Sequence, residues 1–554
     1  MNYWHTLNQT IQRTLATNRI GAPVFLRCTI VVNENDIAET TTVQYVVAAV
    51  LSMTNDWFGA TPAQHYAASS TQPKANHMTI TAEYATGVMA LLTVSILPTP
   101  THIDLTLLGT TGDIYQKAFI QPLRDGSLDV EAVDAAVVDA VDKALSVERQ
   151  NLAVADRQDA YATTDRQDAC VTVPLGVLLV SGHRTHQENY ATNFAADPRC
   201  QVLALTDEAE IPTERVAWNQ SFADELSIPY IADVDEALAD ERVDIVSICA
   251  EPERRARIAA KCAAAGKHIY LDKPMTPFVD GGNQVAAAVA ASGVCSQMFS
   301  FWHQSWLARA KSVLASGALG ELVSIHADCL FAKGPTHEPE SRAVLGTPRQ
   351  AEYPPIIANF VDAKAELYAM GVYALASVLS LTGCAVQSVY GRTANYFFAA
   401  HQQRNMEDFG FLVMTLERGI TATITGGRIG WTGHGSGGSN QIYLIGTKGA
   451  MLIDAYAPRI EVYDTASPWT PPAVHPGDPM GFWSSTQAEV DTQPKRVYTP
   501  LSNAISARSD ESHFVDCVLE GREAEVNAEK AAMLTKVLLA GYESAATGEV
   551  MRLS

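Results

Sequence analysis

The chain lacks the features that would tie it to nucleic acid or to a membrane. Among its 554 residues, 39 are lysine or arginine and 61 are aspartate or glutamate, which gives a formal charge of −22. No basic run offsets this charge locally, so the surface repels nucleic acid phosphates and anionic membranes. No apolar stretch approaches the roughly 20 residues that cross a bilayer, and the N-terminus does not resemble a secretory signal. We expect a cytoplasmic protein.

Cysteine pairs with metal-ligand spacing are also missing. The nine cysteines are scattered along the chain, and none belongs to a C-x-x-C pair. This pattern suggests neither a zinc cluster nor a disulfide framework, so we expect no metal and reduced thiols. Hydrophobic residues at 47% and charged residues at 18% are normal values for a globular protein.

The length of the chain requires several domains, because one hydrophobic core stops growing at roughly 250–300 residues. The same five polar-rich residue types occur at 156–160 and at 165–169, without apolar periodicity. We therefore expect a linker at residues 151–171. The expected domains are residues 1–150, 172–298 and 299–554.

Short apolar runs alternate with helical stretches between residues 175 and 295. The expected strands are Gly176–Val180, Gln201–Thr206, Val243–Ala250 and His268–Leu271, and Arg254–Ala265 is an expected helix. Alternating β and α units predict a parallel sheet with right-handed crossovers. The middle of the chain is therefore predicted to be an α/β domain of the Rossmann type.

The strands expected after residue 320 alternate apolar with polar residues. They are Leu322–Cys329, Gly410–Leu416, Ile420–Thr425 and Gln441–Ile445. This alternation is typical of a mostly antiparallel open sheet with helices on one face, such as Leu367–Leu381. We expect a domain of the α+β type.

The first 150 residues repeat the order of features of this α+β domain. Leu107–Asp113 parallels Leu444–Ala450, with a shared Gly-Thr-x-Gly turn, and Ile20–Val24 parallels Leu319–Val323. We infer a diverged, catalytically silent copy of the C-terminal domain, fused in front. The alternative is that two α+β domains share this turn by chance.

The turn after the first middle-domain strand is a candidate dinucleotide site. Glycine lets the backbone approach a pyrophosphate, and the following helix N-terminus offers free N–H groups. Only one glycine of the G-x-G-x-x-G pattern remains here, and an ordinary β–α turn is the alternative. The candidate residues are Ser181, Gly182, His183 and Arg184.

Asp207 ends the next expected strand. A carboxylate there accepts hydrogen bonds from the adenosine ribose and repels a 2′-phosphate, which favours NAD over NADP. A helix-capping role for Asp207 is equally compatible. Arg184 could bind a phosphate and leaves NADP open.

Two further segments resemble a known family. Ser247–Pro252 ends a strand, and Ala265–Met275 follows one helix later. In residues and spacing they resemble the Gfo/Idh/MocA family, which includes glucose–fructose oxidoreductase and inositol dehydrogenase. The family's usual Glu-Lys-Pro appears here as Asp272-Lys273-Pro274. The resemblance extends over residues 175–550, including Gly317–Leu322 and His513–Asp516.

The resemblance implies an NAD(P)-dependent oxidoreductase in which Lys273 lies beside the nicotinamide and assists proton transfer from the substrate hydroxyl. It also implies that Glu251, Pro252 and Asp272 contact the cofactor. A partly desolvated ammonium stabilises a developing alkoxide, and its pKa can fall toward the working range. A lone lysine is more often a solvated surface charge, but Pro274, which is tied to a fixed turn in relatives, argues against that interpretation.

Family members usually place Asp and His four residues apart on the first helix of the second domain. The corresponding residues here are Ala369 and Tyr373, so the usual acid/base pair is absent. Tyr373 could donate its phenol proton to the substrate, with a packed core tyrosine as the alternative. Lys364 and Glu366, one turn upstream, could supply the lost charge.

Three further residues are candidates for substrate contact. Trp302 and His303 follow the last Rossmann strand, where relatives line the substrate pocket, and His434 lies in a glycine-rich stretch that could equally be a surface loop.

The expected reaction moves hydride between the nicotinamide and a sugar, cyclitol or related polyol. The alternatives are an NAD-dependent glycoside hydrolase that oxidises its substrate transiently, and a non-catalytic nucleotide-binding sensor. Relatives often dimerise through the open faces of their C-terminal sheets, so residues 1–150 are expected to form an internal pseudo-dimer with residues 299–554.

Overall fold

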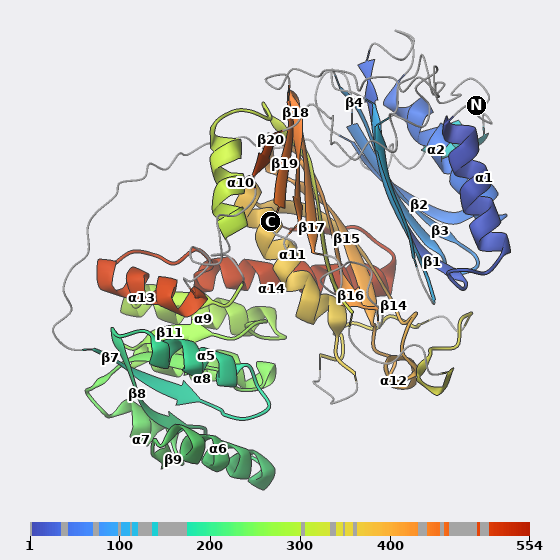
Figure 1. The fold of residues 1–554 in the computed structure, drawn as a ribbon. Coiled ribbons are helices and arrows are strands. Elements are labelled where there is room, and N and C mark those ends of the chain that lie inside the picture. Colours follow the sequence, from blue (N-terminus) through green and yellow to red (C-terminus); the bar gives the residue numbers. More distant parts are fainter. Residues whose placement is uncertain are drawn as a thin grey trace, which may run out of the picture.

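The computed structural model contains three β-sheets of six, six and nine strands in its described residues (Figure 1). These residues are 3–34, 42–69, 77–97, 101–110, 113–119, 136–141, 174–300, 305–332, 339–346, 349–357, 363–429, 440–454, 459–464, 496–498 and 509–553. The three sheets follow one another along the chain. The expected linker at 151–171 lies outside the described residues.

The middle sheet is parallel throughout, as predicted, in the order β12-β11-β10-β7-β8-β9. This is the strand order of a doubly wound Rossmann domain, whose ligands bind where the order reverses. Here that point lies between β7 and β10. The strands are β7 (Leu175–Val180), β8 (Cys200–Thr206), β9 (Tyr230–Ile231), β10 (Val243–Ile248), β11 (His268–Leu271) and β12 (Ser296–Met298).

Both faces of this sheet are buried, which explains the uninterrupted apolar runs of its central strands. Leu178 and Val246 pack on one face in a cluster that includes residues of α8 and α9. Val177 and Ile245 pack on the other face with Phe194 of α5. The connecting helices are α5 (Gln187–Ala196), α6 (Thr213–Leu226), α7 (Val234–Leu238), α8 (Pro252–Ala264) and α9 (Val279–Ser292).

The C-terminal sheet has the order β20-β19-β18-β17-β13-β16-β15-β14-β21. Its pairs are antiparallel except for β13 with β16, so the predicted mostly antiparallel sheet is confirmed. The strands are β13 (Leu322–Phe331), β14 (Val386–Ala394), β15 (Phe409–Leu416), β16 (Thr421–Arg428), β17 (Gln441–Gly446), β18 (Gly449–Asp454), β19 (Arg459–Asp464), β20 (Arg496–Tyr498) and β21 (Met551–Arg552). The helices of this region are α10 (Ser305–Ala315), α11 (Glu366–Thr382), α12 (Ala399–Gln403), α13 (Asp510–Glu520) and α14 (Ala528–Thr547).

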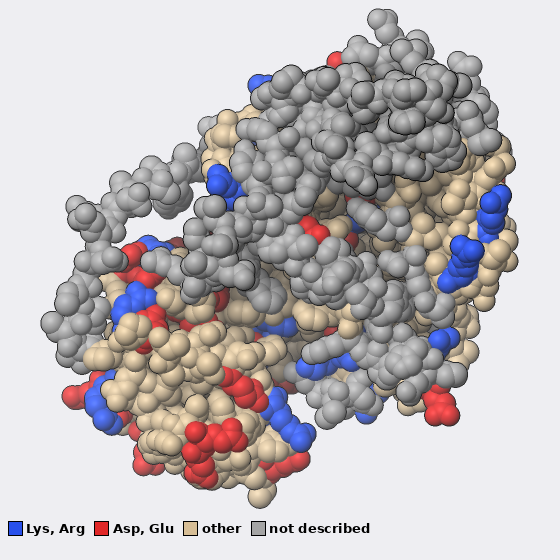
Figure 2. All heavy atoms as spheres, in the orientation of Figure 1, with Lys and Arg blue, Asp and Glu red and all other residues tan. Residues whose placement is uncertain are grey.

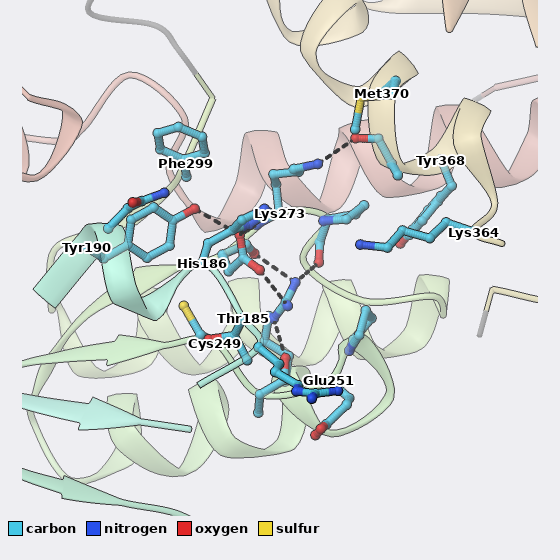
Figure 3. A pocket seen from close by; sticks show the side chains of 18 of the residues that line it. Thr185, His186, Tyr190, Cys249, Glu251, Lys273, Phe299, Lys364, Tyr368 and Met370 are labelled. Carbon is cyan, nitrogen blue, oxygen red and sulfur yellow. Dashed lines mark hydrogen bonds and ion pairs between the residues drawn. The ribbon is translucent and has the colours of Figure 1, made fainter. Parts of the chain in front are cut away.

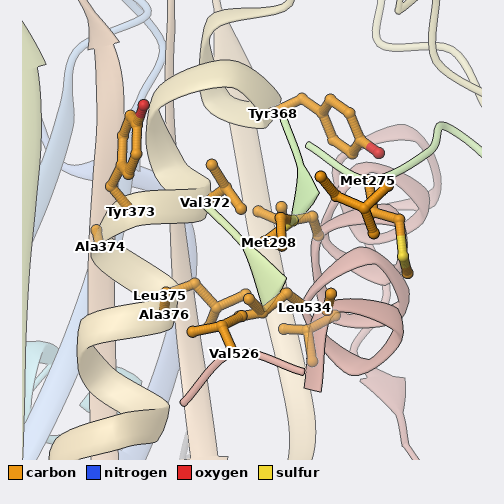
Figure 4. Packing of buried hydrophobic residues seen from close by; sticks show 14 of the residues in the cluster. Met275, Met298, Tyr368, Val372, Tyr373, Ala374, Leu375, Ala376, Val526 and Leu534 are labelled. Carbon is orange, nitrogen blue, oxygen red and sulfur yellow. The ribbon is translucent and has the colours of Figure 1, made fainter. Parts of the chain in front are cut away.

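Helix α11 joins the two domains. It packs closely on β16, because a Cβ added to Gly426 would lie 2.6 Å from the backbone nitrogen of Gly371. On its other side, Val372 and Leu375 belong to the same buried cluster as Met298 of β12 (Figure 4). This packing fixes α11 against the Rossmann domain.

The N-terminal sheet has the order β2-β3-β4-β1-β5-β6, and β1 pairs parallel with β4 and antiparallel with β5. The C-terminal sheet contains the same arrangement in β14-β15-β16-β13-β17-β18. Helix α2 follows β1 as α11 follows β13. The elements are α1 (Tyr3–Ala16), β1 (Pro23–Asn33), α2 (Val43–Phe58), β2 (Pro62–Ser69), β3 (His77–Tyr84), β4 (Met89–Leu97), β5 (His102–Gly109) and β6 (Asp113–Phe119).

The Gly-Thr-x-Gly turns of the two sheets also share their contacts. Thr110 N donates to the carbonyl of Ala22 at 2.9 Å, and Thr447 N donates to that of Glu321 at 2.8 Å. A register shift follows the first residue of both β1 and β13. A Cβ at the turn's first glycine would lie about 2 Å from a backbone oxygen in either sheet, which explains the glycine.

The N-terminal and C-terminal sheets pack face to face, with α1 and α2 on the outer side of the first (Figure 1). The Phe25 and Phe409 rings are 4.9 Å apart, and Tyr66 stacks on Tyr390 at 4.9 Å. Arg27 forms a buried ion pair with Asp328 of the other sheet. It forms a second buried ion pair with Asp104 of its own sheet. The interface therefore combines an aromatic cluster with buried charges.

The surface of the Rossmann domain carries acidic and basic side chains that alternate, at the lower left of Figure 2. Among the helices that the structure describes, none combines the length and apolar character needed to cross a membrane.

Candidate active site

A cavity of about 1000 Å³ lies at the carboxyl ends of β7, β10 and β11, where the strand order reverses. We call it the central cavity (Figure 3). Its Rossmann wall comes from Arg184–His186, Cys249–Pro252 and Asp272–Pro274. Its opposite wall comes from Lys364–Glu366 and from α11. The site is therefore built between two domains.

The turn after β7 keeps a tight backbone without the usual glycines. Ser181 and Arg184 have φ values of 64° and 63°, in the left-handed region that glycine adopts without strain. Gly182 is close-packed, since an added Cβ would meet Phe222 at 3.0 Å. Thr185 and His186 line the cavity immediately before α5, so the positive end of this helix faces the cavity.

The four candidate residues of this turn do not share one environment. Arg184 lines the cavity, and its guanidinium lies 4.7 Å from the ring centre of Trp218. Ser181 and Gly182 are buried beneath the turn and bond to Asp207 and Asn219. His183 points to Glu225 at 2.7 Å. Only Arg184 of these four is placed to contact a ligand in the cavity.

Asp207 is fully buried and does not line the central cavity. Its carboxylate accepts hydrogen bonds from Ser181 Oγ at 2.7 Å and Asn219 Nδ2 at 2.8 Å, and it pairs with Arg254 at 2.7 Å. It also does not cap α6, whose N-cap is Pro212. The observed contacts of Asp207 hold the β7 turn to the neighbouring strand and helices.

Asp272 anchors the end of β11. It pairs with Arg255 at 3.0 Å and with His186 at 2.8 Å, and it accepts from the Tyr190 hydroxyl at 2.9 Å. Burial acts to raise the pKa of this carboxyl, but the charges of Arg255 and His186 hold it well below its usual value. Asp272 therefore stays ionised and fixes the backbone that leads to Lys273.

Lys273 is buried at the junction of the two domains, with 6% of its surface exposed. Its Nζ donates to the carbonyl of Ala369 at 2.7 Å and lies 4.6 Å from the ring centre of Tyr373. Burial lowers the pKa of Lys273 to about 8 against the charge of Asp272, and the charge of Lys364 adds to the lowering. The Lys273–Pro274 peptide bond is cis. Lys273 is therefore not a solvated surface charge.

Helix α11 and the segment before it bring the other predicted residues to the same wall. Tyr373 lines the cavity, and its ring meets that of Phe299 edge-on at 6.1 Å. Glu366 pairs with Arg428 at 2.5 Å and lies 3.5 Å from His401. Burial raises the pKa of Glu366, but His401 and Arg428 lower it overall. Lys364 also lines the cavity (Figure 3).

Several lining residues were not anticipated from the sequence. Arg255 is one of three arginines near the start of α8, and only its position on the buried side of the helix distinguishes it. His186 and Tyr190 could have been found, because the first turn of a helix after a β–α turn faces the ligand crevice. The other unanticipated lining residues include Arg215, Trp218, Phe299, Arg428 and Glu511. The predicted substrate residues Trp302, His303 and His434 lie outside the described residues.

A doubly wound sheet, a cavity at its switch point and a buried lysine facing a second domain define a nicotinamide-dependent oxidoreductase. Residues 177–300 match the oxidoreductase family with an NAD-binding Rossmann fold, and residues 307–452 match the C-terminal domain of the Gfo/Idh/MocA family. These two domains belong to the Gfo/Idh/MocA family. The predicted class of enzyme and its nicotinamide cofactor are thereby confirmed.

Two curated relatives are themselves described only as oxidoreductases. YrbE of Bacillus subtilis is 24% identical over 280 residues, which are 50% of this chain and 73% of YrbE. YhhX of Escherichia coli is 24% identical over 157 residues, or 28% of this chain and 40% of YhhX. The chain thus spans well under two thirds of the second relative.

Solved structures with the same fold cover most of this chain. An oxidoreductase domain protein from Kribbella flavida matches with a TM-score of 0.52 and 17% identity, over 69% of this chain and all of that protein. GenD2 from gentamicin A biosynthesis, solved with NAD, matches with a TM-score of 0.50 and 22% identity, over 71% of this chain and all of GenD2. At these identities the likeness shows the fold alone.

Proposed function

We propose that this protein transfers hydride between NAD(P) and a hydroxyl-bearing carbon of a sugar, cyclitol or related polyol. The observation that carries the proposal is the position of Lys273, which is buried at the end of β11 with its Nζ directed to α11. The nicotinamide supplies the hydride chemistry, and the residues of the chain bind, orient and move the proton.

The residues of the central cavity fit a dinucleotide. The N-terminus of α5 faces the cavity, and its N-cap residue His186 makes no capping hydrogen bond with its side chain, although Thr185 Oγ1 accepts from the Gln187 N–H at 3.0 Å. A helix N-terminus in this position can bind a pyrophosphate. Arg184 is a cation on the same wall, supported by the ring of Trp218. Glu251 and Pro252 follow β10 beside this wall. We assign these residues to cofactor binding.

The choice between NAD and NADP is part of this proposal. Asp207 is engaged by Arg254, so its charge is neutralised beneath the turn. A neutralised carboxylate repels a 2′-phosphate less than a free one. Arg184 could in turn pair with that phosphate. The family match indicates NAD, and NADP is the alternative cofactor.

Lys273 is proposed to take the proton from the substrate hydroxyl as the carbonyl forms. With its pKa near 8, a useful fraction of Lys273 is neutral at mildly alkaline pH and can accept a proton. The carbonyl of Ala369 holds Nζ in place. The face of Tyr373 stabilises the protonated form. Tyr373 is the candidate second contact to the substrate oxygen, and Glu366 is proposed to position Arg428.

Nucleotide binding by the purified protein provides the direct test. Calorimetric titration with NAD, NADH, NADP and NADPH is expected to show tight binding of at least one pair. A screen of sugars and polyols should then give net formation of reduced nicotinamide. Lys273→Met should retain nucleotide binding and lose turnover by a factor of about 10²–10⁴.

The possible results distinguish the proposed function from its alternatives. If no nucleotide binds, the proposed function fails and a scaffold role takes its place. If a nucleotide binds but substrate is cleaved without net reduction, the reaction is the transient oxidation of a glycoside hydrolase. If Lys273→Met turns over normally, the assigned role of Lys273 is wrong.

We also propose that residues 1–150 are a diverged copy of the C-terminal domain that acts as an internal pseudo-dimer partner. The shared strand order, register shifts and turn contacts support this interpretation. Its residues do not line the central cavity in the described part of the chain, which is consistent with a catalytically silent copy.

A cytoplasmic location is part of the proposed function, and the free thiols of the described residues are compatible with it.

A further inference from the structure

We propose that the substrate carries an anionic oxygen group, a carboxylate or a phosphate, and that Lys364 binds it. This inference rests on the proposed function and narrows its substrate class from polyols in general to acidic ones. It follows from the balance of charges around the central cavity.

The acidic residues that line the cavity in the described part of the chain each have a partner. Glu251 pairs with Arg215 at 2.7 Å, and Asp272 pairs with Arg255 at 3.0 Å. Glu366 pairs with Arg428 at 2.5 Å. Glu511 accepts from Asn193 at 3.1 Å and from Tyr270 at 3.3 Å, and burial raises its pKa. These carboxylates are therefore not available to a further cation.

Three cations of the lining remain without a carboxylate partner among the described residues. They are Arg184, which rests on Trp218, Lys273, which bonds to a neutral carbonyl, and Lys364. The only hydrogen bond found for Lys364 in the described chain runs from its backbone N–H to His401 at 3.3 Å. Its ammonium therefore lacks a described partner.

Lys273 and Lys364 both line the central cavity. In Figure 3 the side chain of Lys364 extends from the second domain toward the segment that carries Lys273. Burial is the main cause of the lowered pKa of Lys273, and the charge of Lys364 acts in the same direction. Two ammonium groups that repel each other in a partly buried space are stabilised by an anion between them. Since neither ammonium group has a carboxylate partner among the described residues, we infer that an oxyanion of the ligand binds here.

The cofactor does not meet this requirement. Its phosphates are assigned to the N-terminus of α5 and Arg184, on the Rossmann wall. Lys364 precedes α11, the helix that carries Tyr373, on the opposite wall. A bound nicotinamide ring would bring no negative charge to this wall. The anion that Lys364 meets therefore belongs to the substrate.

The positive charge at this site is confined to a few residues, and the chain as a whole is acidic, with a formal charge of −22. A general attraction for anions is excluded by that charge, so recognition depends on the lysines themselves. A charge-assisted hydrogen bond to an ammonium in a partly buried site distinguishes an acid from its neutral analogue. We expect a preference of at least about tenfold in binding.

Direct anion binding tests the proposal without turnover. Sodium acetate and inorganic phosphate are titrated by calorimetry into the protein with and without saturating NAD. Binding is expected in the wild type, and it should weaken at least about tenfold in Lys364→Met. Lys530→Met removes an exposed lysine of α14 and serves as the matched control, which should bind like the wild type. Tighter binding of acetate or of phosphate identifies which oxyanion the site takes.

A second measurement follows the same lysine during turnover. With glucose, gluconate, glucuronate and glucose 6-phosphate as a matched panel, the acidic members are expected to be favoured in kcat/KM, and Lys364→Met should remove that preference. The proposal is overturned if neither anion binds, or if anion binding is equal in Lys364→Met. Failure of NAD to bind would instead count against the proposed function, because the anion titration does not require NAD.

Discussion

Lys273 is surrounded by groups that act on its proton affinity in opposite directions. Burial and the charge of Lys364 favour the neutral amine, and Asp272 favours the ammonium. The result is a pKa of about 8, compared with 10.5 for a free lysine. A lysine with a pKa near 8 is partly neutral near the pH of a cell, whereas an exposed lysine is almost fully protonated.

This proton affinity leads to a pH prediction. In the direction of alcohol oxidation, Lys273 must be neutral to accept a proton, so kcat/KM should rise with pH, pass its midpoint near 8 and then level off. In Lys364→Met the midpoint should move to higher pH, because a neighbouring positive charge has been removed. A pH–rate profile of both proteins measures the two midpoints. Equal midpoints would mean that Lys364 does not act on Lys273.

At the scale of residues, the sequence allowed a part of the site to be predicted. Lys273 was assigned from its Asp-Lys-Pro segment, and its place between two domains follows from its position at the end of a parallel strand. The contacts of Asp207 could not be predicted in this way. Its partners Asn219 and Arg254 lie on two different helices, and only tertiary packing brings them to the carboxylate.

Among the helices and strands, α11 contacts both the C-terminal sheet and Lys273 of the proposed site. Its backbone touches β16 at Gly371 and Gly426, and it carries Ala369 and Tyr373 to Lys273. The distance between helix and sheet therefore sets the geometry of the proposed site.

Gly426→Ala should separate this helix from its sheet. The new Cβ would lie 2.6 Å from the backbone of Gly371, so we expect a loss of about 1–3 kcal/mol in unfolding free energy and a lower kcat/KM. Denaturant unfolding and steady-state kinetics measure the two effects. Gly383→Ala, at the C-cap of the same helix, meets no atom within 4 Å and should only strain a left-handed residue. The contact is unimportant if both variants behave alike.

The sequence predicted eight strands and two helices of the two catalytic domains, since apolar runs and helical periodicity depend on local sequence. Leu322–Cys329, for example, was expected as a strand, and the structure has β13 at Leu322–Phe331. The two-residue strands β9 and β21 were not predicted, because they carry too few residues to show a period. Their pairing depends on neighbours distant in the chain.

In the whole molecule, the first and third sheets share an interface whose contacts could not be predicted in detail. It places Phe25 against Phe409 and Phe411, and it buries the pairing of Arg27 with Asp328. Sequence alone offered the shared turn and the idea of a partner within the chain. It could not reveal which side chains meet, because sheet-to-sheet contacts have no sequence period of their own.

A chain that begins at Thr172 tests the role of this surface. Without the first sheet, the aromatic face around Phe409 would be exposed to water, and a large exposed apolar patch promotes association. We expect dimers or aggregates in light scattering, together with a lower melting temperature. The same shortened chain with Phe409→Lys and Phe411→Lys should associate less. A shortened chain that is monomeric, soluble and equally stable would disprove the internal pseudo-dimer.

The pairing of Arg27 with Asp328 has a consequence for inheritance. By strand register, Arg27 of β1 corresponds to His326 of β13, and Asp328 corresponds to Thr29. In a symmetric pair of identical subunits, every mutation appears on both sides at once, so such one-sided partners cannot arise independently. With both halves encoded in a single gene, each sheet is free to mutate alone, and one half can specialise as a permanent partner while the other keeps the catalytic residues.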